Sequence, residues 1–181
     1  MPLTTTTIDL EDEYHRLSDE MERYAEEQAK YDRGTDGAQV AAAQGQRAER
    51  LRSGVAWAMD YPGHPDVDGS GWDVQTLTVG ALTNGDRHLV NDVADEVGYK
   101  RADAYVAAGT VDAPFLQHDA DDRTVDEFKA TVQAIPDLHP SFVDWLEDRI
   151  TDISQVGEEG KSYLELVQAK RSQATSPDES G

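Results

Sequence analysis

The sequence contains no cysteine among its 181 residues. This excludes disulfide bonds, thiolate nucleophiles and metal sites built on cysteine. No run of 18 apolar residues is present, so no membrane-spanning helix is expected. The first seven residues have neither a basic start nor an apolar core, and they therefore do not resemble a signal peptide. We expect one soluble domain, or one domain with a small appendage, in the cytoplasm.

Basic residues are scarce in the chain. Its 16 Lys and Arg residues face 37 Asp and Glu residues, which gives a formal net charge of -21. Phosphate groups would be repelled by this charge, and no basic stripe is present to offset the repulsion. Anionic membrane surfaces would be repelled in the same way. We therefore expect no nucleic-acid partner and no membrane partner.

Lysine and isoleucine are both rare in this acidic chain, which has five Lys and four Ile residues but eleven Arg residues. This composition resembles proteins of salt-loving archaea and their viruses, which implies the potassium-rich cytoplasm of a host cell. At molar salt the Debye length falls to about 3 Å, so the carboxylates repel one another little. The competing interpretation is disorder, because Leu, Ile, Val and Phe make up only 34 residues. The regular spacing of those residues favours a folded chain.

The first strong pattern is a heptad-like repeat over residues 9–31, which predicts a helix that packs along a partner. Its seam consists of Leu10, Tyr14, Leu17, Met21, Tyr24 and Tyr31, with Gln28 as the one polar member. Glycines at 34 and 37 end this helix, and a second helix is predicted from Asp36 to Met59. The apolar side of the second helix is marked by Val40, Ala48, Leu51, Val55 and Met59.

Two helices joined by a short glycine-containing turn predict an antiparallel hairpin over residues 1–60. An intramolecular seam is favoured over an intermolecular coiled coil, and the oligomeric state stays open. Residues 61–71 contain two prolines and three glycines and are predicted to form a linker. A helical domain with a short β element is expected over residues 72–171, followed by a disordered polar tail at 172–181.

Residues 72–79 are rich in β-branched and aromatic side chains, which predicts a strand. That strand needs a hairpin mate or another chain to pair with, and the segment just before it is the only candidate mate, although a poor one. Helices are predicted after Thr83, over residues 101–108, after Thr124 and from Pro140, with a last turn over 163–171. The predicted fold class is therefore mainly α, an N-terminal helical hairpin plus a small helical domain with one short strand or β-hairpin.

Two segments partly match ion-binding or nucleotide-binding motifs. Residues 156–162 end in Gly-Lys-Ser, but the first glycine of a phosphate-binding loop is replaced by Gln155. A flexible connection between helices is the favoured interpretation there. Residues 66–71 resemble the first half of a calcium loop, but the twelfth position is Leu77 rather than glutamate. A hydrated Asp/Gly turn is favoured, and whether Asp66 and Asp68 bind a cation stays open.

Catalytic residues do not stand out in this sequence. None of the five histidines lies four residues from another, so no zinc-binding helix is predicted. His15 and His118 are expected at the surface, and no Gly-x-Ser-x-Gly motif supports a serine nucleophile. We therefore expect a protein that is not an enzyme and that has no cofactor and no metal site.

The order of elements from about residue 70 to residue 153 resembles tail assembly chaperones of tailed viruses. A short strand at 72–79 leads into a helix containing Asn-Gly-Asp-Arg-His-Leu-Val-Asn-Asp-Val. An apolar stretch from Tyr105 to Leu116 follows, and a closing helix begins after Ile135-Pro-Asp-Leu-His-Pro. The resemblance covers about 85 residues and depends on the order of elements, without an invariant motif. Residues 1–60 lie outside it.

The resemblance implies a non-enzymatic protein that binds the long helical tape measure protein and keeps it soluble during viral tail assembly. Binding of an amphipathic helix in an apolar groove fits an acidic protein with apolar helix faces. The residues expected to form the core or the partner-binding groove are Trp72, Leu77, Phe115, Phe142, Trp145 and Leu146. Trp145 flanks the apolar stripe of its helix and is expected to be partly exposed.

Two alternatives remain open at this point. A structural virion or scaffold subunit would oligomerise through the N-terminal helices. An enzyme with an unrecognised active site would require residues that the sequence pattern does not single out.

Overall fold

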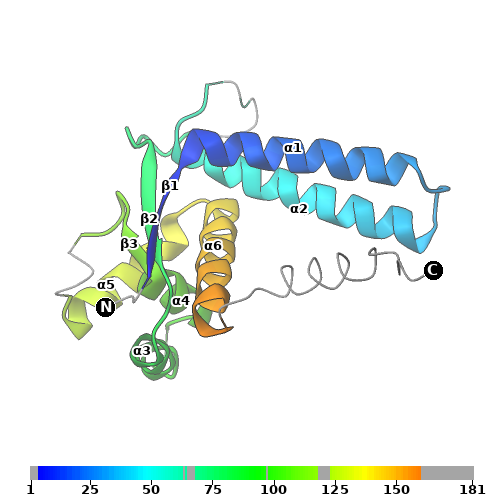
Figure 1. The fold of residues 1–181 in the computed structure, drawn as a ribbon. Helices are drawn as coiled ribbons and strands as arrows, with labels where there is room; N and C mark the ends of the chain where they lie inside the picture. Colours follow the sequence, from blue (N-terminus) through cyan, green and yellow to red (C-terminus); the bar gives the residue numbers. More distant parts are fainter. Residues whose placement is uncertain (1–3, 63, 65–67, 97, 118–122, 160–181) are drawn as a thin grey trace, which may run out of the picture.

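A computed structural model describes residues 4–62, 64, 68–96, 98–117 and 123–159 of the chain. Within these residues the fold is mainly helical with a small antiparallel sheet (Figure 1), which confirms the predicted fold class. The elements in chain order are β1 (Thr5–Asp9), α1 (Leu10–Ala29), α2 (Asp36–Ala58), β2 (Thr76–Gly80), α3 (Asn84–Ala94), α4 (Arg101–Gly109), β3 (Thr110–Asp112), α5 (Val125–Ala134), a 3-10 turn (Ile135–Asp137) and α6 (Pro140–Glu159).

Helices α1 and α2 form the predicted hairpin. Asp9 caps α1 by accepting a hydrogen bond from the Asp12 amide, and Thr35 caps α2 by accepting one from Ala38. Such caps satisfy amide groups that have no partner inside the helix. The two helices lie side by side and project from the rest of the molecule as an arm (Figure 1). The heptad-like seam is therefore intramolecular, as favoured from the sequence.

The strand predicted over residues 72–79 corresponds to β2, which begins four residues later, at Thr76, and its predicted mate was wrong. β2 pairs on one side with β1 and on the other with β3, both antiparallel, so that it is the central strand. The polar run Thr5–Asp9 was not predicted as a strand. It lies at an edge of the sheet, where Thr7 and Thr78 are directly opposite and their hydroxyl groups are 3.0 Å apart. Cross-strand Thr pairs of this kind stabilise antiparallel pairing.

The later helices begin where the sequence predicts. Thr83 and Thr124 each accept a hydrogen bond from the amide three residues on. The side chains of Asp86 and Glu127 bond back to the same capping residues, which completes two capping boxes. Pro140 is the first residue of α6, a position that needs no amide donor.

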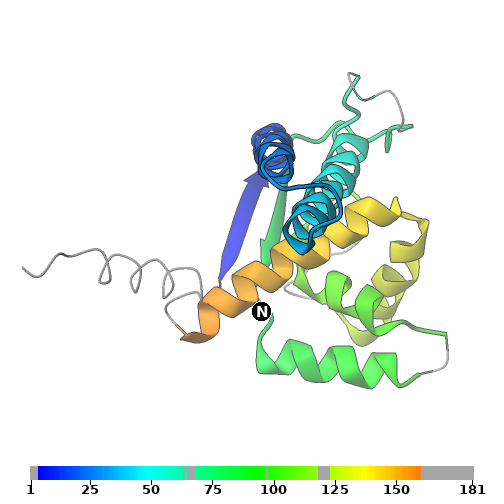
Figure 2. The same cartoon turned by 90° about the vertical axis from the view of Figure 1, so that its right-hand side faces the viewer.

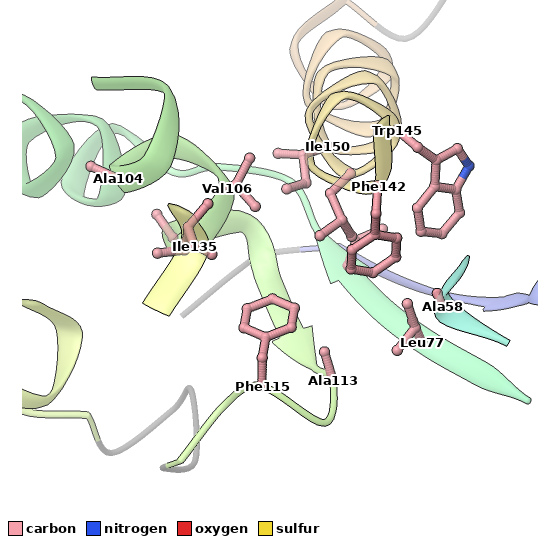
Figure 3. Close-up of a cluster of buried hydrophobic side chains, with 14 of the residues drawn as sticks. Ala58, Leu77, Ala104, Val106, Ala113, Phe115, Ile135, Phe142, Trp145 and Ile150 are labelled. Atoms are coloured by element: carbon pink, nitrogen blue, oxygen red, sulfur yellow. The ribbon is translucent and has the colours of Figure 1, made fainter. Parts of the chain in front are cut away.

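One hydrophobic core joins the hairpin to the remaining elements. Leu10 and Leu17 of α1 belong to the same buried cluster as Leu77 of β2, Val106 of α4 and Ile150 of α6. Figure 3 shows side chains of α6 and α4 converging with those of β2 and the segment after β3. The base of the hairpin is thus part of the core.

Helix α6 crosses α2 where a glycine permits close approach (Figure 2). A Cβ atom at Gly54 would collide with the backbone of Ser141 and Phe142 at the start of α6. Farther along, Arg47 and Arg50 of α2 form ion pairs with Asp148 and Asp144 of α6, respectively. The contact therefore covers the C-terminal half of α2.

Candidate protein-interaction site

Five of the six residues predicted to form the core or the partner-binding groove are in the core. Leu77, Phe115, Phe142, Trp145 and Leu146 are all buried. Trp72 is the one that stays partly exposed while packing against the core. Five of these side chains therefore have little surface to offer a partner in this conformation.

The predicted partial exposure of Trp145 was wrong, because its indole ring is fully buried. The ring stacks on Phe142, with centroids 5.6 Å apart. Its Nε1 donates a hydrogen bond of 2.9 Å to Oε1 of Glu13, which comes from α1. A buried indole N–H needs such an acceptor, and only the tertiary arrangement of α1 against α6 provides it.

Glu13 is the centre of a buried polar network that the sequence analysis missed. Arg16 donates two hydrogen bonds to it, of 2.8 and 2.7 Å. Nε of Arg149 lies 3.6 Å from Oε1 of Glu13, which is an ion-pair distance but too long for a hydrogen bond. Burial alone would raise the pKa of Glu13, but the hydrogen bonds from Arg16 and Trp145 and the charge of Arg149 outweigh it. The pKa of Glu13 is therefore lower than usual, and the carboxylate stays charged.

This network connects the hairpin to α6, and its features are those of a group of residues that stabilises the fold. Arg149 also pairs with Asp148 and Asp152 of its own helix, and Asp148 in turn pairs with Arg47 of α2. The carboxylates and guanidinium groups pair with one another, although Nε of Arg149 has no hydrogen-bond partner among the described residues. Its position in the heptad, three residues after Leu10 and four before Leu17, is the signal that could have identified it.

The residues of the predicted hairpin seam are buried near the core and exposed at the tip. Leu10 and Leu17 are buried, and Tyr14, Met21 and Tyr24 are partly buried. Tyr31 is 45% exposed, because α1 ends at Ala29 and Tyr31 leaves the helical register.

Val40 was also predicted on the apolar side of α2, yet it is 62% exposed. It lies in the N-terminal half of α2, beyond the segment that α6 covers. Ala48, Leu51 and Val55, which were predicted with it, are buried.

A pocket of about 390 Å³ opens beside Trp72. It lies where the start of α1, the end of α2 and the segment before β2 meet. Apolar residues and carboxylates share its wall, which is lined by Asp9, Leu10, Glu11, Met59, Asp60, Gly71, Trp72, Asp73, Val74 and Gln75. Asp9, Glu11, Asp60 and Asp73 are exposed. The pocket therefore combines apolar lining residues with exposed carboxylates, which we call its acidic rim.

The backbone at the end of α2 shapes this pocket. Asp60 has a φ of 51°, the left-handed conformation that ends many helices. Its carboxylate accepts a hydrogen bond of 3.0 Å from the Gly71 amide. Ser70 returns to α2 as well, because its amide donates to the Trp57 carbonyl and its hydroxyl to the Ala58 carbonyl. These bonds hold the segment that carries Trp72 against the end of α2.

Trp72 is part of a cluster of partly exposed aromatic rings. Its ring meets that of Trp57 edge to face, with centroids 4.9 Å apart. Trp57 in turn packs on His139 at 5.9 Å and on Phe142 at 5.4 Å. Trp57 and His139 are partly exposed, whereas Phe142 anchors the cluster in the core. Trp57 does not stand out in the sequence, because a Trp in an alanine-rich helix does not indicate what surrounds it.

The described part of the chain contains one close contact between a serine and a histidine, and no metal-binding cluster. No cluster of three or more acidic or histidine side chains there could hold a metal ion. Ser53 and His64 are 3.4 Å apart, but Ser53 donates to the Glu49 carbonyl and Nδ1 of His64 has no partner among the described residues. No helix in this part of the chain has both the length and the apolar character that a bilayer-spanning segment needs.

Several predictions fall on residues outside the described part of the chain. Asp66 of the partial calcium loop, His118, the Gly-Lys-Ser sequence, the turn at 163–171 and the tail at 172–181 all belong to this group. Asp68, the other acidic residue of the calcium loop, is described and is exposed.

Comparison with known proteins gives no assignment of family. No protein-family model, curated protein or solved structure matches this chain.

Proposed function

We propose that this protein is a non-enzymatic binding protein whose partner docks on the pocket beside Trp72. The observation that carries this proposal is the combination of partly exposed, mutually packed Trp rings with an acidic rim. Protein interfaces are organised in this way, with an aromatic centre that supplies most of the binding energy and a polar rim around it.

The rim specifies the chemistry of the partner. Four exposed carboxylates surround the pocket, and the chain as a whole carries a charge of -21. A partner segment that places an apolar side chain against Trp72 and basic side chains around it would be complementary in both shape and charge. An amphipathic helix with Lys or Arg beside its apolar stripe fits this description.

The finer proposal is that the partner is a tape measure protein and that the chain is a tail assembly chaperone. Two arguments support it. The order of elements after residue 70 resembles that of such chaperones, and the pocket would suit a long helical partner. Because Phe115, Phe142, Trp145 and Leu146 are buried, we place the proposed site at the surface around Trp72.

The proposal predicts that a long helical protein is encoded next to this chain, and co-expression of the two at high salt tests it. Asp73→Lys reverses a charge on the rim without touching the core, because Asp73 is exposed. We expect it to reduce co-elution of the partner in size-exclusion chromatography. Asp92→Lys, on the exposed side of α3, makes the same charge change elsewhere and serves as the control.

Two results would contradict the proposal. If the wild-type protein neither co-elutes with that partner nor keeps it soluble, the chaperone assignment is wrong. If Asp73→Lys and Asp92→Lys reduce binding equally, the pocket is not the binding site and only net charge matters.

A further inference from the structure

Strand β1 forms one edge of the sheet in the described part of the chain. Its inner side pairs with β2, and the Ala81 amide donates a hydrogen bond of 2.9 Å to the Thr4 carbonyl. In an antiparallel ladder, residues that bond to the neighbouring strand alternate with residues that do not. Thr5, Thr7 and Asp9 therefore direct their backbone amide and carbonyl groups away from β2, toward the outer side of β1.

This outer edge lacks the usual protection of an edge strand. Folded proteins cover such an edge, shorten it or place charged residues on it, because its open amide and carbonyl groups can pair with any extended chain. Residues 5–8 of β1 carry no charge, and they are exposed apart from Ile8, which is partly buried. We therefore expect another segment to cover the edge.

The end of α6 lies beside the start of this edge. Oγ of Ser154 accepts a hydrogen bond of 3.1 Å from the Leu82 amide, and the preceding residue, Ala81, is the one that bonds to Thr4. Helix α6 continues for about 8 Å beyond Ser154 to Glu159. Figure 2 shows that it ends on the side of β1 that faces away from β2.

We infer that residues 163–167 pair with the outer edge of β1 as a fourth strand of the sheet. They read Tyr-Leu-Glu-Leu-Val, and no other large apolar residue follows Glu159. Residues 160–162 leave a connection of the usual length between a helix and a strand. Attachment to α6 gives this segment a high effective concentration at the edge. A second copy of the chain has no such advantage, and its charge of -21 repels it.

The two faces of β1 set the orientation of the added strand. Ile8 packs against the core and lies opposite the buried Leu77, whereas Thr7 is on the other face and is exposed. Because α6 ends beside the start of β1, the added strand runs parallel to β1. Side chains alternate between the faces of a sheet, so a strand that places its two leucines beside Ile8 extends the core and leaves Glu165 beside Thr7. The inference does not depend on the proposed function.

Hydrogen exchange of the full chain at molar potassium chloride, measured for each amide by NMR, tests the inference. In a strand that pairs on one side only, every second amide is bonded. We expect alternate amides of residues 163–167 to exchange at least about tenfold more slowly than in an unfolded peptide. A helix over the same residues would protect consecutive amides. That result would overturn the inference, and so would exchange without protection.

A proline at position 7 separates this pairing from the rest of the sheet. Thr7→Pro removes an amide that points away from β2, so it leaves the bonds between β1 and β2 in place while it blocks a strand on the outer side. Protection of residues 163–167 should be lost, and the amides of β2 should stay protected. Thr7→Ala is the matched control, because it keeps the amide, and it should retain both. Unchanged protection of residues 163–167 in Thr7→Pro would overturn the inference.

Disulfide cross-linking gives an independent test, because the chain has no cysteine of its own. Thr7→Cys combined with Glu165→Cys should form a disulfide within one chain on mild oxidation. Thr7→Cys combined with Gln173→Cys is the control, since position 173 lies beyond the proposed strand, and it should react much more slowly. Equal rates for the two pairs would overturn the inference, as would a disulfide that joins two chains.

Discussion

Replacing Glu13 with alanine should destabilise the protein far more than replacing any exposed glutamate of α1. Glu13 is 6% exposed and accepts the indole hydrogen bond of Trp145 inside the core. After truncation, the Trp145 N–H would be buried without an acceptor. Leaving such a donor unsatisfied costs about 1–3 kcal/mol.

The loss of the ion pairs adds a smaller amount. The Arg16 side chain is 42% exposed and keeps Glu20 as a second partner at 2.9 Å. Water and Glu20 would therefore replace most of its interaction with Glu13, which leaves a contribution below about 1 kcal/mol. The expected total is about 1–4 kcal/mol, or a decrease in Tm of about 2–16 °C for a chain of this size.

Urea unfolding followed by circular dichroism at molar potassium chloride measures this difference. Glu22→Ala is the control, because Glu22 is exposed on the same helix and its removal changes the net charge by the same amount. A second variant, Trp145→Phe, removes the indole N–H but keeps a ring in the core. In the Trp145→Phe background, Glu13→Ala should cost less, because no buried donor is left unsatisfied.

Two outcomes would refute this reasoning. A Glu13→Ala variant within about 0.5 kcal/mol of Glu22→Ala would show that the network contributes no more than a surface charge. An unchanged cost of Glu13→Ala in the Trp145→Phe background would show that the hydrogen bond between the two residues is not the source of the stability.

Three further predictions concern pH, packing and salt. The pKa of Glu13 is lowered by folding, so its carboxylate stabilises the fold above the usual pKa of 4.5 and loses this effect as the pH falls through the lower folded value. The difference in stability between the wild type and Glu13→Gln, measured by thermal melts, should therefore shrink below about pH 4.5. A difference that grows instead would refute the assignment. Gly54→Ala should destabilise the protein, because the added Cβ would collide with the backbone of Ser141; the expected loss in urea unfolding is about 1–3 kcal/mol, and a neutral result would show that α2 and α6 separate at little cost. Helical circular dichroism should strengthen from dilute buffer to molar potassium chloride, because the charge of -21 is then screened; an unchanged cooperative melt at low salt would contradict a dependence of folding on salt.

Local sequence was sufficient to predict most helices of this protein. The heptad-like spacing from Leu10 to Tyr24 and the capping boxes at Thr83 and Thr124 depend on residues three or four positions apart. Such interactions form within one helix and need no information about the rest of the fold. The order of helices and the mainly α class follow from them.

Pairing between distant segments could not be predicted in the same way. The edge strand Thr5–Asp9 is polar and shows no apolar alternation. It becomes a strand because β2, about 70 residues later, offers its free amide and carbonyl groups. A search limited to neighbouring segments therefore found the wrong mate.

The tertiary structure alone decided which aromatic residues are exposed. Trp145 and Trp72 both occur in segments with strong apolar character, and periodicity gives no measure of what lies opposite each ring. Glu13 of α1 supplies the acceptor that allows the Trp145 indole to be buried. Trp72 stays partly exposed because the turn at Asp60 and Ser70 sets it at the edge of the core. The burial of Trp145 depends on a contact with a residue 132 positions away, and helical or strand periodicity contains no information about such a contact.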